Sequence, residues 1–137
     1  MGRVINPESA GKDRTRLVKS TVLAMRELMR QTQPDDTSRD LAAYISLSPL
    51  EIFAMIEPSV GAWEKKGYWV KADRFRLEWE WTGRVGEAMK QAVLGEDWAG
   101  IARIAVQVGG KFSNVNLPVN NRLGTPWIGA YRHLKSL

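Results

Sequence analysis

Apolar residues recur every three or four positions along most of this chain, which is the period of an amphipathic helix. The pattern predicts a first helix from Arg14 to about Thr32, with Asp13 as its N-cap. A second apolar-rich stretch runs from Ser38 to Lys66, in which Ser48 and Pro49 have the order of an N-cap and a first-turn proline. We expect short helices laid nearly end to end there, or one long rod kinked at its prolines.

The stretch from Ala72 to Gln91 fits two periods. From Arg74 to Trp81, apolar and charged residues alternate, as they do in a strand. Over the whole stretch, however, the spacing of three and four separates a charged sector from an apolar one. The charged sector comprises Asp73, Arg76, Glu80, Arg84, Glu87 and Gln91, and the apolar sector comprises Ala72, Phe75, Trp79, Thr82, Gly86, Met89 and Val93. Because the helical pattern covers the whole stretch, it favours a helix.

The remaining segments complete an all-α interpretation. We expect a helix from about Asp97 to Val108, a loop over residues 109–124 and a last helix after Thr125 and Pro126. Residues 1–12 have the composition of an irregular arm. The chain is therefore predicted to be a single helical domain over residues 1–137, an irregular bundle of four to five helices with an extended C-terminal segment. Phe112, Val115, Leu117 and Val119 are expected to anchor that segment, and Ile128, Tyr131 and Leu134 to share one side of the last helix.

Residues 40–83 support an alternative α+β fold. The order of four segments here resembles the winged-helix family of DNA-binding domains. These segments are a helix over Leu41–Ser46, a Leu47-Ser48 turn, a recognition helix within Pro49–Lys66 and the exit Glu64-Lys65-Lys66-Gly67-Tyr68. The resemblance implies two wing strands, near Trp69–Lys71 and Phe75–Trp81, and a DNA-binding transcriptional regulator. The implied recognition helix departs from that family, because it is apolar and acidic and lacks the donors that reach phosphates and bases.

Composition excludes several classes of protein. The 137 residues include no cysteine, so disulfides and thiolate chemistry are absent, and His133 is the sole histidine, so one chain cannot build a multi-histidine metal site or a histidine-based triad. The N-terminus lacks the apolar run of a secretory signal, and no segment approaches the roughly 20 apolar residues of a membrane span. We therefore expect a cytoplasmic protein without a membrane partner.

Charge is unevenly distributed along the chain. The net charge is +5, with basic residues concentrated before residue 31 and after residue 100, and carboxylates concentrated between residues 31 and 60. Basic ends attract an acidic protein or a nucleic acid. Equally, they neutralise the acidic segment within one molecule or in a dimer.

These observations lead to a non-enzymatic helical interaction module that self-associates as a homo-oligomer or binds an acidic or anionic partner. No matched catalytic, metal-binding or cofactor-binding set is present. Asp35, Asp36 and Asp40 could ligate a cation, but helix capping explains them more simply. Six tryptophans are many for this length and suit a core or an interface. The candidate partner-binding residues are Lys12, Arg14, Arg16, Lys19, Trp69 and Trp81.

Overall fold

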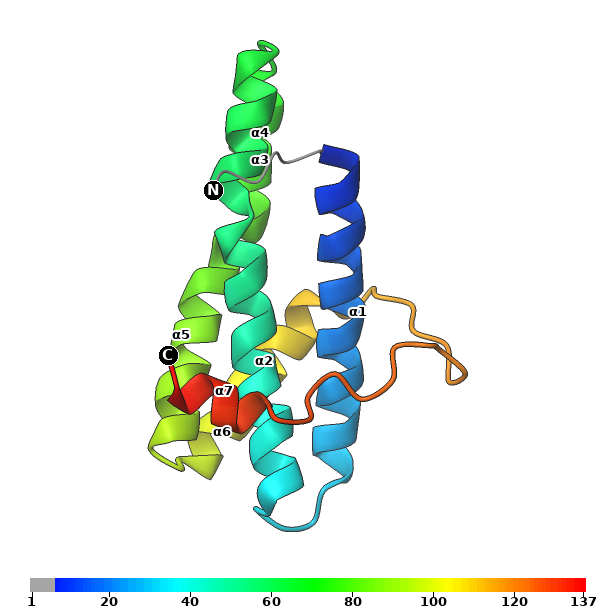
Figure 1. Ribbon diagram of the computed structural model, residues 1–137, viewed down its shortest axis with the longest axis vertical. Helices are drawn as coiled ribbons and strands as arrows, with labels where there is room; N and C mark the ends of the chain where they lie inside the picture. The colour runs from blue at the N-terminus through cyan, green and yellow to red at the C-terminus, as the bar shows by residue number, and fades with distance from the viewer. Residues whose placement is uncertain (1–6) are drawn as a thin grey trace.

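The computed structural model of the chain describes residues 7–137, and these form helices and loops without any strand (Figure 1). The helices within this range are α1 (Pro7–Arg30), α2 (Asp36–Ala54), α3 (Ile56–Lys65), α4 (Trp69–Trp79), α5 (Trp81–Leu94), α6 (Trp98–Lys111) and α7 (Ala130–Lys135). The predicted all-α irregular bundle is confirmed. Two of the predicted helical regions are each divided by a single residue, at Met55 and at Glu80.

The winged-helix alternative is wrong. Trp69–Lys71 lies in the first turn of α4, and the second expected strand, Phe75–Trp81, runs from α4 across Glu80 into α5. The apolar sector predicted for this stretch is confirmed, since Ala72, Phe75 and Met89 are buried. The charged sector faces solvent, which explains why the alternation between Arg74 and Trp81 was misleading: it is a local coincidence within a helical pattern.

The first helix begins earlier than the sequence predicted. α1 starts at Pro7, so residues 7–12 of the expected irregular arm are helical and Asp13 lies inside the helix rather than at its N-cap. Proline suits the first turn of a helix because its missing N–H would have no partner there. Residues 1–6 lie outside the described part of the chain.

α2 is the central helix of the bundle and packs against α1, α5 and α7. Buried hydroxyl groups fix its register: Ser46 Oγ donates to the carbonyl of Gly86 at 2.8 Å, and Ser48 Oγ lies 2.6 Å from Thr21 Oγ1 of α1. Ser48 is therefore not an N-cap, and Pro49 lies inside α2 rather than in a first turn. The hydroxyl contact to another helix explains why the local cap signal was misleading.

α3 and α4 form a helical hairpin that extends beyond the end of α1 (Figure 1). Its own small core consists of Ile56, Val60, Ala72 and Phe75, separate from the main core of the bundle. Gly67, with φ of +78°, makes the tight turn between the two helices, a conformation that glycine adopts without strain. The hairpin is thus a distinct projection joined to the bundle at Met55 and Glu80.

The C-terminal segment differs in detail from its prediction. α6 continues through Gly109 and Gly110 to Lys111, so the loop begins at Phe112 and extends to Gly129. Phe112 and Leu117 are buried as expected, and Arg26 donates to the Leu117 carbonyl at 2.8 Å, but Val119 is exposed. The last helix starts at Ala130, later than Thr125 and Pro126 suggested. Its predicted apolar side includes the buried Leu134, whereas Ile128 is exposed.

One helical stretch corrects the expectation that no segment is long and apolar enough to span a membrane. By length and composition, the 30 residues Asp36–Lys65 are long and apolar enough to cross a membrane, with a mean hydropathy of 1.2 in the most apolar window. Half of that window is buried inside the bundle, as in the core helix of many globular proteins. The apolar character of the stretch is therefore weak evidence for a membrane span.

Candidate binding site on the hairpin

A basic and aromatic hollow lies where the hairpin meets α1. Its volume is about 690 Å³, and three cationic side chains line it, Arg14 from α1 with Lys71 and Arg74 from α4. Trp63, Val70, Phe75 and Glu78 complete the lining. The lining therefore contains three cations and one carboxylate. We call this hollow the hairpin pocket.

Arg14 holds the hairpin against α1 through aromatic rings. Its guanidinium carbon lies 4.7 Å from the centroid of the Phe75 ring and 5.3 Å from that of Trp79, within the range of a cation–π interaction. Burial lowers the pKa of Arg14 from its ordinary value, and the charge of Glu78 opposes this effect. Arginine nevertheless stays protonated at any physiological pH, so Arg14 is a partly desolvated cation.

No carboxylate of the described side chains lies within 4 Å of the Arg14 guanidinium. By contrast, Arg76 on the same hairpin pairs with Glu57 at 3.1 Å, and that contact raises the pKa of Arg76 and lowers the pKa of Glu57. A partly buried cation without a carboxylate has unused hydrogen-bonding capacity for an incoming anion.

A second hollow continues on the other side of Arg14. It has a volume of about 440 Å³ and brings Lys19 near Trp79 and Asn116 of the C-terminal segment. The predicted residues Arg14 and Lys19 therefore lie along one connected surface of α1. Lys12 is exposed on α1. Arg16 lies near Tyr44, whose pKa is raised by burial, and the charge of Arg16 opposes that increase. The structure does not bring Lys12 or Arg16 into the hairpin pocket.

The two predicted tryptophans have opposite environments. Trp69 lies at the tip of the hairpin with 61% of its surface exposed, so its predicted accessibility is confirmed. The expectation for Trp81 is wrong, because only 7% of it is exposed and its ring packs edge-on against Phe112 at 5.2 Å. Its Nε1 donates to the Glu78 carbonyl. Phe112, which follows α6, packs against the flank on which Trp81 lies, and a helical wheel does not register a contact with a distant segment.

Sequence reasoning missed Lys71 and Arg74 as site residues. The signal was present: Lys71, Arg74 and Glu78 are spaced by three and four, so on a helix they share one face. The same chain segment was also compatible with a strand, in which Lys71 and Arg74 would have pointed to opposite faces. The basic residues of α1 were predicted as site residues because the excess of positive charge near the N-terminus is visible in the sequence without any knowledge of the fold.

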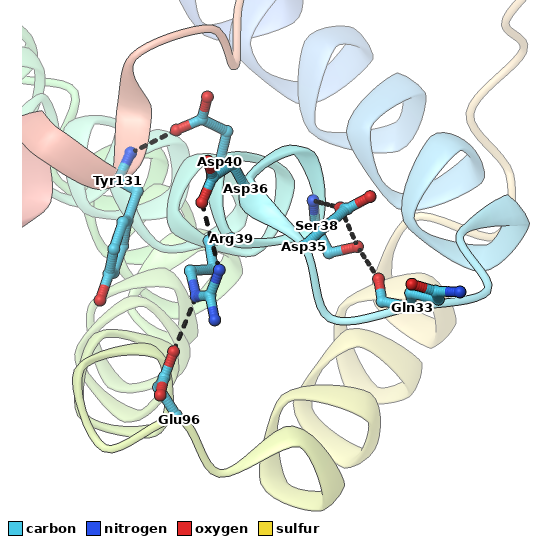
Figure 2. A network of polar contacts seen from close by, with 8 residues as sticks. All are labelled: Gln33, Asp35, Asp36, Ser38, Arg39, Asp40, Glu96 and Tyr131. Atoms are coloured by element: carbon cyan, nitrogen blue, oxygen red, sulfur yellow. Dashed lines mark hydrogen bonds and ion pairs between the residues drawn. The ribbon is translucent and has the colours of Figure 1, made fainter.

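Helix capping, the simpler explanation of the three aspartates in the sequence, is confirmed for Asp35 and Asp40 (Figure 2). Asp35 caps α2 by accepting from the Ser38 amide at 2.9 Å, and this hydrogen bond is the main reason that the pKa of Asp35 is lowered. Asp36 pairs with Arg39, whose Nε also contacts Glu96 at 2.7 Å. Asp40 accepts from the amides of Gly129 and Tyr131 at the start of α7.

Across residues 7–137, no group of three or more histidine, aspartate or glutamate side chains is arranged to hold a metal ion. His133 is exposed in α7. Comparison of the chain with protein-family models, with curated proteins and with solved structures yields no match. The hairpin and its surroundings therefore provide the best indication of function.

Proposed function

We propose that this protein is a non-enzymatic helical interaction module that recognises an acidic or anionic partner through the α3–α4 hairpin. The observation that carries the proposal is the partly desolvated Arg14 guanidinium, which lines the hairpin pocket with Lys71 and Arg74 and has no described carboxylate within 4 Å. Charge-assisted hydrogen bonds from arginine are strong, and removal of water strengthens them further.

The protruding shape of the hairpin supports the same role. Its tip presents Tyr68 and Trp69 to solvent, and these residue types are enriched in the energetic centres of protein interfaces. The surrounding cations would guide a partner of opposite charge, while the aromatic side chains would supply buried area. A cytoplasmic location remains part of the proposal.

A glutamate-rich peptide titrated against the intact chain tests the proposed function. We expect binding that weakens with added salt and that falls on the order of tenfold, or about 1.4 kcal/mol, in Lys71→Glu/Arg74→Glu. The matched control is Arg122→Glu/Arg132→Glu, which changes the net charge equally at exposed positions of the C-terminal segment. Equal losses in both variants would show that total charge, rather than the hairpin pocket, determines binding.

A further inference from the structure

An apolar groove lies between the end of α1, the following turn and α6. Its volume is about 620 Å³, and its walls include Met25, Leu28, Ile101 and Ala105. No charged side chain lines it. At its edge, Met29 and Val106 are 84% and 75% exposed, although both are apolar. We call this the α1–α6 groove.

One end of the α1–α6 groove is acidic. The turn residue Pro34 and the α6 residue Trp98 line the groove, and each is adjacent in sequence to an exposed carboxylate, Asp35 and Asp97 respectively. Asp36 and Glu96 lie around the same start of α2, where Arg39 contacts both of them (Figure 2). Asp35 also bonds to the lining residue Ser38, so this end of the groove suits the positively charged part of an occupant. Exposed arginines are adjacent in sequence to lining residues elsewhere along the groove, namely Arg26, Arg30 and Arg103.

The hairpin tip is apolar and flanked by lysines, so it complements an apolar groove with an acidic end. Tyr68, Trp69 and Val70 are consecutive and are 54%, 61% and 67% exposed. The exposed Lys65, Lys66 and Lys71 flank them. Contiguous exposed apolar surface that is bordered by charge marks an interaction site.

The tip cannot reach the groove of its own molecule. The tip is at one end of the longest axis of the molecule, and the turn between α1 and α2, which contributes to the groove, is at the other (Figure 1). A tip that occupies an α1–α6 groove must therefore belong to a second molecule.

We propose that the hairpin tip of one copy docks in the α1–α6 groove of a second copy, with the tip lysines facing Asp35 and Asp97. This inference rests on the proposed function, because it makes the hairpin the recognition element and the acidic end of the second copy's groove the surface that it recognises. Tip and groove are different surfaces, so the contact is heterologous and leaves a free tip and a free groove at the two ends. Association therefore continues into chains unless the geometry closes a ring.

Two variants and their mixture test the heterologous contact. Trp69→Ser/Val70→Ser removes the tip surface, and Met29→Lys/Val106→Lys places positive charge in the groove. All four positions are exposed, so folding is retained. In sedimentation experiments we expect wild type to increase in mass with concentration, each variant alone to associate at least tenfold more weakly, and an equimolar mixture to form a one-to-one dimer. The mixture pairs the intact groove of the first variant with the intact tip of the second.

Matched controls use exposed apolar residues elsewhere. Leu77→Ser, on α4 away from the tip, and Val119→Lys, in the C-terminal loop, are expected to associate as wild type does. Equal loss of association in these controls would overturn the inference, since it would indicate non-specific hydrophobic attraction. A mixture that stays monomeric would also overturn it, because an intact groove and an intact tip would then be present together without pairing. Association of either variant alone at wild-type strength would overturn it as well, because it would point to a symmetric contact between like surfaces.

The glutamate-rich peptide separates this inference from the proposed function. The groove variant keeps its hairpin pocket, so we expect it to bind the peptide as wild type does. If wild type is monomeric but still binds the peptide, the self-association is overturned and the proposed function is retained. If wild type is monomeric and does not bind the peptide, both the self-association and the proposed function are overturned. Monomeric wild type whose Trp69 fluorescence shifts to the blue on anionic vesicles would instead assign the tip to a membrane surface and overturn the inference.

Discussion

The carboxylate of Asp40 accepts a hydrogen bond from the backbone amide of Tyr131 at 3.0 Å, across 91 positions of sequence. The same side chain accepts from Gly129, so a residue of α2 caps the first turn of α7. A helix as short as α7 is unstable alone. Its position therefore depends on this cap and on the burial of Leu134 against the bundle.

Replacing Asp40 by alanine should release α7. We expect a loss of about 1 kcal/mol in the free energy of unfolding, the usual cost of a missing helix cap. Hydrogen exchange should show faster exchange of the amides in residues 129–135. Glu87→Ala, at an exposed position of α5, should change stability by less than about 0.5 kcal/mol. Unchanged exchange in α7 would mean that packing of Leu134 alone holds the helix.

Replacing Gly86 by alanine should destabilise the bundle although alanine is the better helix former. An added Cβ would meet Leu50 Cγ at 2.6 Å and the Ser46 carbonyl oxygen at 3.0 Å, so α2 and α5 would have to separate. We expect a loss of about 1–3 kcal/mol, typical of overpacking.

The matched control for this substitution is Gly110→Ala in α6, where an added Cβ meets nothing within 4 Å. Alanine has a higher helix propensity than glycine, and here it causes no clash. We therefore expect the free energy of unfolding to stay unchanged or to rise by up to about 1 kcal/mol. Chemical denaturation of both variants measures the difference. Equal stability of the two would show that α2 and α5 accommodate the methyl group by a small shift.

Stability should fall on acidification partly because of Asp35. The Ser38 amide lowers the pKa of Asp35 in the folded protein, so the unfolded state binds the proton at higher pH than the folded state does. The stability that ionised Asp35 adds to the folded protein is therefore complete above the ordinary pKa of about 4. It is lost as the pH falls through the lower pKa that Asp35 has in the folded protein. Thermal unfolding between pH 7 and pH 2.5 should show a shallower acid decline for Asp35→Asn, which still caps but does not titrate. An identical decline would assign the pH dependence to other carboxylates, such as Glu57.

Fluorescence quenching should separate the exposed and buried tryptophans. Trp69 is exposed at the tip and Trp81 is packed against Phe112, so acrylamide reaches the first and not the second. Trp69→Phe should remove a readily quenched part of the emission, whereas Trp81→Phe should leave that part unchanged. The reverse result would contradict the packing of α5 on the C-terminal segment.

Periodicity predicted the helices because each buried face follows from local spacing. The sector from Ala72 to Val93 is the clearest case, since its buried and exposed positions agree with the wheel even across the break at Glu80. The contact of Trp81 with Phe112 was not predictable from spacing, and so Trp81 was assigned to the surface. Local caps were equally ambiguous, because Ser48 bonds to Thr21 of another helix.

The candidate site was predictable only in part. Charge alone identified Arg14 and Lys19, but their aromatic neighbours belong to a hairpin more than 40 positions further along the chain. The α1–α6 groove had no signal in sequence, because Met29 and Val106 simply continued the apolar faces of two helices. Whether another helix covers such a residue depends on the tertiary arrangement, which spacing does not specify.

The way in which the hairpin joins the bundle has a consequence for any ligand of the hairpin pocket. The small core of Ile56, Val60, Ala72 and Phe75 is distinct from the main one, but Trp79 packs against both, so one aromatic side chain links the two cores. The guanidinium of Arg14 lies over the rings of Phe75 and Trp79, so it contacts both the small core and the side chain that links the cores. Under the proposed function, an anion bound in the hairpin pocket would therefore lie at the junction of the two cores.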